Sequence, residues 1–268
     1  MFQARVPARC FRIVSNDEPG VLATESAADR EEPAMTMIEQ RVLRALEPVT
    51  FDLYRDIHKG IRSELFAVTT AAGSLDPADR AGRADLAGHV HAVADLLVQH
   101  AEHEDAVVQP ALETHLPALA ETIAIDHPVL EARIAAIRDL ADDAAEAPSL
   151  APRNDVHRVY VELAAFTGAY LSHQDLEERE VMPALARAVG YEEILAMHQA
   201  IVGSIPPEEM AKSLALMLPA MNVDDRTEML GGIQLGAPAE VFESVWGLAR
   251  SVLTTSDGNA LARRLGIA

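Results

Sequence analysis

Two histidine–glutamate pairs with identical spacing are the residues of this chain that could do chemistry together. His100 precedes Glu104 by four residues, and His173 precedes Glu177 by four residues. Each pair is followed by Pro-Ala-Leu, with the proline ten residues after the histidine. Residues four apart share one face of an α-helix, so each pair can present an imidazole and a carboxylate on the same side. One such pair is usually a surface ion pair, but its repetition indicates a common role.

A further histidine precedes each pair at a similar distance. His58 lies 42 residues before His100, and His127 lies 46 residues before His173. The chain therefore contains two copies of a helical hairpin, each with the pattern His…His-x-x-x-Glu. In each copy the predicted loop is about equally far from both histidines. Because the rise per residue in a helix is constant, both histidines of a hairpin are expected at the same height.

Six side chains are therefore predicted to meet in one layer of a four-helix bundle, and they are predicted to bind metal. Burying such groups without partners would cost several kcal/mol, whereas a pair of metal ions would supply a partner for all of them. Imidazole and carboxylate ligands without thiolate suit iron, manganese or zinc. A buried site with open positions suits dioxygen chemistry, so two iron ions are the expected cofactor. The predicted ligands are His58, His100, Glu104, His127, His173 and Glu177.

The segments around these residues resemble the hemerythrin-like (HHE cation-binding) family over about residues 50–189. The resemblance is carried by "DIHKG" at His58, "HAEHE" at His100, "DHPVL" at His127 and "HQDLE" at His173. It implies a four-helix bundle around a non-haem di-iron centre that binds oxygen, nitric oxide or peroxide. It also implies that the same six residues are ligands and that both carboxylates bridge the irons.

One departure from the family pattern affects the expected function. The classical oxygen carriers have two histidines one turn apart on the third helix, whereas here His127 has Ile123 four residues before it and Glu131 four residues after it. One iron thus lacks an imidazole, which favours peroxide handling or sensing over oxygen transport. Glu131 or His103 could fill this position, although the second hairpin has Leu176 at the offset of His103 and so does not support it.

The elements that must position these residues are all predicted to be helices. Apolar residues recur at spacings of three and four, and Gly190 ends the last long helix. The fold class is therefore all-α, an up-down-up-down four-helix bundle in residues 38–189 with a C-terminal helical extension in residues 190–268. The short amphipathic helices of this extension need a partner, and the outer surface of the bundle is the expected one. Long helices are expected over about 50–72, 83–115, 118–145 and 155–189, with a short helix before residue 48.

Bulk properties limit the partners and the location. Among 268 residues the formal net charge is -20, which disfavours binding to nucleic acid or to an anionic membrane. The single cysteine, Cys10, excludes an intrachain disulfide and cysteine-rich zinc sites, and a cytoplasmic location is expected. Residues 1–37 show no sustained periodicity and are predicted to be a disordered tail, with Met35 or Met37 as the true start.

The leading functional hypothesis is a non-haem di-iron protein that binds or senses oxygen or a related small molecule such as peroxide or nitric oxide. The alternative is an enzyme, a di-iron peroxidase or catalase-like protein that decomposes hydrogen peroxide at the more open iron. A third hypothesis is a structural bundle whose histidines have no joint role. Iron content separates the first two hypotheses from the third, and peroxide turnover separates the second from the first.

Overall fold

The computed structural model describes residues 46–148 and 152–267, which form helices and contain no strand. The predicted tail, its alternative start residues and most of the short helix expected before residue 48 lie outside this part of the chain. Residues 46–48 are described and are not helical. No helix within the described ranges is both long enough and apolar enough to cross a membrane.

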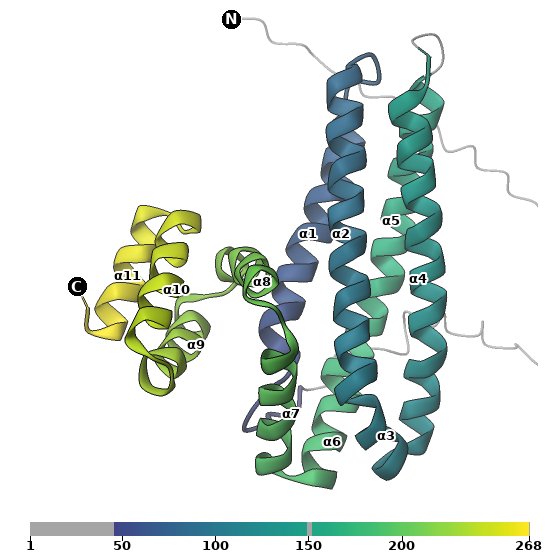
Figure 1. Ribbon diagram of the computed structural model, residues 1–268. Coiled ribbons are helices and arrows are strands. Elements are labelled where there is room, and N and C mark those ends of the chain that lie inside the picture. Colours follow the sequence, from purple (N-terminus) through teal and green to yellow (C-terminus); the bar gives the residue numbers. More distant parts are fainter. Residues whose placement is uncertain (1–45, 149–151, 268) are drawn as a thin grey trace, which may run out of the picture. The chain divides into compact units, whose positions relative to one another are not determined.

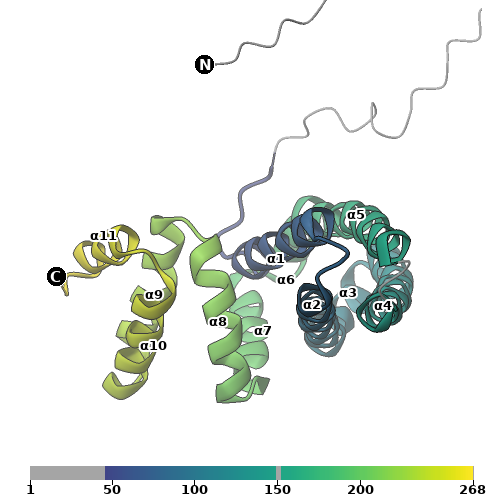
Figure 2. The same ribbon diagram turned by 90° about the horizontal axis from the view of Figure 1, so that it is seen from above.

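Four long helices lie side by side and form a helical bundle (Figures 1 and 2). In chain order they are α1 (Arg55–Ser74), α2 (Arg80–Val107), α4 (Pro117–Glu146) and α5 (Pro152–Leu176). Each packs against the next, and α5 packs back against α1, so the four helices enclose a common interior. The prediction of an all-α helical bundle is confirmed.

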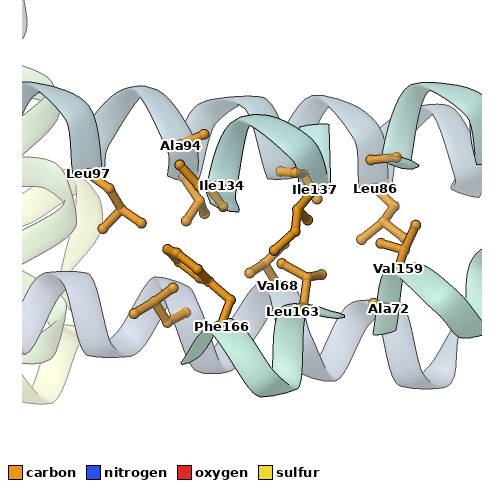
Figure 3. Packing of buried hydrophobic residues seen from close by; sticks show 14 of the residues in the cluster. Val68, Ala72, Leu86, Ala94, Leu97, Ile134, Ile137, Val159, Leu163 and Phe166 are labelled. Atoms are coloured by element: carbon orange, nitrogen blue, oxygen red, sulfur yellow. The ribbon is translucent and has the colours of Figure 1, made fainter. Parts of the chain in front are cut away.

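Apolar side chains fill the interior of the bundle along most of its length. Buried residues at helical spacing on α1, such as Ile61, Leu65 and Val68, meet residues from the other three helices. Figure 3 shows Phe166 and Ile134 pointing toward one another from different helices within this main apolar cluster. Each fully buried side chain of this size stabilises the fold by about 1.5–3 kcal/mol, which fixes the helices relative to one another.

A second apolar group, the end cluster, lies on the other side of the predicted ligand positions from the main cluster. It includes Leu112, Met182 and Leu185, which are almost fully buried. The predicted ligand positions therefore lie between two apolar clusters. The main cluster contributes the flanking residues Ile61, Leu97, Leu130 and Tyr170, and the end cluster contributes Tyr54, Val108, Ile123 and Val181.

Two helix boundaries differ from the predicted ones for identifiable reasons. The first long helix begins at Arg55 rather than near residue 50, because Oδ1 of Asp52 accepts the backbone N–H groups of Tyr54 at 2.9 Å and Arg55 at 3.2 Å. The second is interrupted, since α2 ends at Val107 and α3 (Gln109–His115) begins a new helix. Pro110 occupies the first turn of α3, where the missing N–H is tolerated.

The fourth long helix contains a wide turn that was not predicted. The π-helical turn η2 (Glu177–Val181) connects α5 to α6 (Met182–Val189), which ends at Gly190 with a φ of 83°. Pro183 lies in the first turn of α6. It has no backbone N–H, so it cannot donate the hydrogen bond to the preceding turn that a continuous α-helix would require. A π-helical turn is wider than an α-helical one and gives the proline ring room.

Residues 191–265 form five more helices, and the first two of them pack against the bundle. These are α7 (Tyr191–Ser204), α8 (Pro207–Ala220), α9 (Val223–Gly236), α10 (Ala239–Val252) and α11 (Thr255–Leu265). The last four share an apolar cluster of their own. Figure 2 shows α8 beside α1, where Gly60 permits close approach: a Cβ there would lie 3.4 Å from Cα of Met217 and would collide with Leu216. Lys59 on α1 pairs with Asp225 on α9.

Replacing Arg83 with methionine is expected to lower the free energy of unfolding by about 2–3 kcal/mol. The Arg83 side chain is buried and donates to the carbonyl oxygens of Ala144 at 2.8 Å and Ala147 at 3.0 Å, which end α4. Methionine preserves the apolar stem but leaves these carbonyls unpaired. Urea denaturation measures the difference, and Arg80→Met, an exposed position on the same helix, is the control. Equal stability of the two variants would contradict this role.

Candidate metal centre

All six predicted ligands come together in one buried layer. Their donor atoms form two groups, and within each group the atoms lie within 4.8 Å of one another. One group contains His58 and His100, the other contains His127 and His173, and Glu104 and Glu177 belong to both groups. The structure thus brings together side chains from α1, α2, α4, α5 and the first residue of η2.

Each carboxylate lies between imidazoles of the two different groups. Glu104 Oε1 is 3.0 Å from His100 Nε2, and its Oε2 is 3.4 Å from His127 Nε2. Glu177 Oε1 is 3.1 Å from His173 Nε2, and its Oε2 is 3.5 Å from His58 Nε2. The repeated His-x-x-x-Glu motif therefore joins its own histidine to one from a neighbouring helix. This is the arrangement expected of two carboxylates shared by two metal positions.

Several of these donor atoms are buried without a hydrogen-bond partner among the described residues. They include both carboxylate oxygens of Glu104, Oε2 of Glu177 and Nε2 of His127. The short contacts of Glu104 and of Glu177 Oε2 with neighbouring imidazoles lack hydrogen-bond geometry. Nε2 of His58 and Nε2 of His100 are within hydrogen-bond distance of one another at 3.2 Å, so one of them must carry a proton for that bond to form. Polar atoms that face one another in this way, away from water, are costly unless a further group lies among them. The residues therefore fit a pair of metal cations.

Three of the four histidines are held from behind by a carboxylate that contacts Nδ1. When Nδ1 carries the proton, it donates to that carboxylate and leaves the Nε2 lone pair directed into the layer, which is the tautomer a metal requires. The three pairs are His58 with Glu178 at 2.9 Å, His127 with Asp105 at 2.8 Å and His173 with Asp126 at 3.3 Å.

Sequence analysis did not identify these three carboxylates, although a local signal was present. Asp105 directly follows Glu104, Asp126 directly precedes His127, and Glu178 directly follows Glu177. An acidic residue next to a ligand on a helix points about 100° away from it. It can therefore reach the outer nitrogen of an imidazole on the adjacent helix.

The buried charges of the layer shift the pKa values of its carboxylates in opposite directions. Burial and the charge on Glu177 raise the pKa of Glu104 well above its usual range. Burial also opposes the charge on Glu177, but the nearby imidazoles of His127 and His173 outweigh it and lower the pKa of Glu177. Burial likewise lowers the pKa of His127, but the contacts with Glu104, Glu177 and Asp105 raise it to about 11. The metal-free layer therefore favours a proton on His127 and disfavours the charged form of Glu104.

The other group of histidines behaves differently. Burial, followed by the nearby charge of His58, lowers the pKa of His100 to about 3, so this imidazole stays neutral. Burial opposes the charge on Glu178, but its hydrogen bonds with His58 and Arg62 outweigh this and lower its pKa to about 2. Glu178 is thus a fixed negative charge behind His58, and His100 needs no deprotonation to bind a cation.

The remaining candidates lie outside the two donor groups. His103 and Glu131 are half-buried, and neither belongs to a group of potential metal ligands. Tyr54 and Tyr170 are buried against the layer, with ring centroids 5.0 Å from His58 and 5.8 Å from His173. Neither phenol makes a hydrogen bond within the described part of the chain.

Replacing Glu178 with alanine is expected to weaken metal binding by about 10- to 100-fold, because His58 would lose the group that orients it. Oε1 of Glu178 contacts both His58 Nδ1 and, at 2.6 Å, Arg62 Nη1. Titration against a competing chelator measures the affinity. Glu162→Ala, an exposed position on α5, is the matched control. If both variants bind metal equally well, Glu178 does not position His58.

Comparison with protein families finds a match to the model described as "Hemerythrin HHE cation binding domain" over residues 49–185. That range contains all six residues of the layer. Searches for similar curated proteins and for similar solved structures found no match. The matched range covers half of the chain and the whole of the buried histidine–glutamate layer. The chain belongs to the hemerythrin HHE cation-binding domain family.

Proposed function

We propose that the protein holds a non-haem di-iron centre and uses it to bind or sense oxygen or a related small molecule such as peroxide or nitric oxide. The observation that carries this proposal is the membership of Glu104 and Glu177 in both donor groups. Two isolated mononuclear sites would not require shared carboxylates. Two ions with two common bridges account for every donor atom of the layer.

In this proposal each ion has two imidazoles of its own and two carboxylates in common. His58 and His100 would hold one iron, and His127 and His173 would hold the other. When bound, the iron pair supplies a redox-active centre with positions open to a small ligand. The protein contributes orientation, through the carboxylates behind the imidazoles, and exclusion of water, through the apolar clusters on both sides of the layer.

The donor set supports iron over other ions. Imidazole nitrogen and carboxylate oxygen suit iron, manganese and zinc, and no cysteine lies in either group. Two histidines and two shared carboxylates would give each ion four protein ligands, which would close a tetrahedral zinc site but would leave positions free on a six-coordinate iron ion. An open, buried and sulfur-free pair of positions favours oxygen chemistry.

Metal analysis of the aerobically purified protein, together with its visible spectrum, tests the proposal. Two irons per chain are expected, with an absorption band from a bridged iron pair that changes when oxygen is removed and restored. A protein that contains only zinc, or whose iron content stays at one per chain after reconstitution, would contradict the di-iron assignment. Reconstitution with excess ferrous iron before analysis guards against loss during purification.

Decomposition of hydrogen peroxide is the second candidate function. It is supported by Asp105, which is half-exposed and contacts Nδ1 of the buried His127, so protons have a path between solvent and the layer. Oxygen evolution from added peroxide is the test. Rapid evolution that is lost in Asp105→Asn, with both irons retained, favours the enzyme. A stable, reversible oxygen complex without peroxide turnover favours binding or sensing.

The remaining assignments belong to the same proposal. We assign residues 38–189 to the bundle domain, with an up-down-up-down course of its helices, and residues 190–268 to an extension that packs on it. Cytoplasmic location, and small molecules rather than nucleic acid or membranes as partners, stay predictions from the composition. Contacts of α8 with α1 support the packing of the extension.

A further inference from the structure

A cavity of about 440 Å³ lies at the end of the bundle where α1 connects to α2 (Figure 1). The last turn of α1, this connection and the first turns of α5 line it. It is remote from the buried histidine–glutamate layer, since Val156 in its lining lies 17 residues before His173 on α5, about 25 Å along the helix. Its volume is in the range of sites that hold small organic molecules.

One side of the cavity is apolar and carries an aromatic ring. Ala72 and Val156 are buried beneath it, and Leu75 is half-buried. The ring of Tyr160 lies against Gly73, where a Cβ would come within 2.9 Å of the ring, so the glycine leaves room for the ring beside α1. Tyr160 is 37% exposed, and its ring can therefore stack on a planar ligand.

The other side of the cavity offers hydrogen-bond donors and a positive charge. Arg153, Asn154 and His157 line it, and none of these side chains makes a hydrogen bond or ion pair within the described part of the chain. Arg153 and His157 are four residues apart and so share one face of α5. No acidic residue is in the described lining, although the chain has 42 of them, and Asp76 and Asp155 lie outside it. The lining therefore favours an anion.

A buried cation supports the same conclusion. Nη1 of Arg83 donates at 2.5 Å to the carbonyl oxygen of Pro77, which lines the cavity. Its other hydrogen bonds go to the carbonyl oxygens of Ala144 and Ala147. Arg83 is only 3% exposed and forms no ion pair with a carboxylate among the described residues. Because a guanidinium is always charged, this uncompensated charge attracts an anion to the adjoining cavity.

We propose that this cavity is a binding site for a small organic anion with a planar apolar body, of the class of aromatic carboxylates. The guanidinium of Arg153 pairs with the carboxylate, and the side chains of Asn154 and His157 donate further hydrogen bonds to it. The planar body packs between the ring of Tyr160 and the apolar wall. The site is distinct from the metal centre, so the inference goes beyond the proposed function and does not depend on it.

Calorimetric titration of the full-length protein with 2-naphthoate, at physiological ionic strength, tests the charged half of the site. The parent is expected to bind 2-naphthoate about tenfold or more tightly than 2-naphthamide, which has the same rings without the charge. Arg153→Met is expected to weaken 2-naphthoate binding by about tenfold, because a charge-assisted hydrogen bond is lost. Arg158→Met is the matched control, since Arg158 is also exposed on α5 but does not line the cavity. A parent that does not bind 2-naphthoate, or equal binding by the two variants, would overturn the inference.

A second variant tests the planar half of the site. Tyr160→Leu is expected to weaken the binding of 2-naphthoate several-fold while leaving that of cyclohexanecarboxylate, a non-planar anion, nearly unchanged. Tyr191→Leu, which replaces an exposed tyrosine on α7, is the control and should bind both anions as the parent does. Equal weakening of both anions by Tyr160→Leu, or no weakening of either, would contradict stacking on this ring.

Discussion

Replacing Glu104 with alanine is expected to leave the protein unable to hold either metal ion. Glu104 is nearly fully buried and belongs to both donor groups, with one oxygen toward His100 and the other toward His127. If the proposed assignment holds, its loss would remove a ligand from both positions. His100→Ala removes a ligand from one position only, so it is expected to weaken one ion much more than the other.

Metal content after reconstitution, measured together with thermal unfolding, checks this expectation. The parent is expected to hold two irons per chain, His100→Ala close to one, and Glu104→Ala well below one. Glu102→Ala, an exposed glutamate on the same helix, is the control and should match the parent. Retention of two irons by Glu104→Ala would refute a shared carboxylate.

Loss of metal in Glu104→Ala can be separated from loss of structure. Burial and the charge on Glu177 raise the pKa of Glu104, which shows that its charge is unfavourable in the metal-free layer. The metal-free variant is therefore expected to unfold at a temperature no lower than the metal-free parent. Adding metal should raise the unfolding temperature of the parent but not that of the Glu104→Ala variant. A metal-free variant much less stable than the metal-free parent would mean that Glu104 has a structural role instead.

The layer could be predicted from sequence because straight helices convert residue spacing directly into height. The His-x-x-x-Glu repeat and the nearly equal arms of the two hairpins place His58 beside His100 and His127 beside His173 without any knowledge of side-chain packing. The ring centroids of the two pairs lie 5.2 Å and 5.0 Å apart. Most other features of a fold depend more strongly on how side chains pack between the helices.

Helix continuity after each glutamate could not be predicted, because the same spacing from glutamate to Pro-Ala-Leu leads to different backbones. The Pro-Ala-Leu triplet comes after Glu104 and Glu177 at the same distance, yet α2 stops at Val107 while α5 continues through a π-helical turn. Both solutions accommodate a proline six residues after a ligand. The next segment of the chain differs between the two copies, because α3 leads into the connection to α4, whereas α6 continues to Gly190.

The carboxylates behind the histidines depend on how neighbouring helices are rotated about their axes. Glu178 reaches His58 across the α1–α5 interface, and Asp105 reaches His127 from α2 to α4. Periodicity shows which face of a helix is buried, but it gives the rotation of the helix about its axis only roughly. Contacts at the edge of the buried face therefore cannot be predicted from it. The close approach of α8 at Gly60 likewise depends on tertiary packing.

Removing the metal with a chelator is expected to lower the unfolding temperature, by more at pH 9 than at pH 6.5. A ligand bound only by the native state stabilises it by about 4 kcal/mol at 1,000 times its dissociation constant. Metal binding must displace the proton held by His127 and requires the charged form of Glu104, which burial disfavours. The affinity for metal, and the stabilisation that metal provides, therefore rise with pH.

The metal-free protein is expected to show the opposite trend. The pKa of His127 is raised to about 11 in the folded state, against about 6.5 in an unfolded chain. This difference stabilises the fold fully below about pH 6.5, and the stabilisation is lost progressively as the pH rises toward about 11. Thermal unfolding between pH 6.5 and 9, with and without iron, should therefore give slopes of opposite sign. In metal-free His127→Gln the downward slope should largely disappear, because glutamine carries no titrating proton. A metal-free parent whose stability increases over this range would show that the layer does not hold the proton assigned to His127.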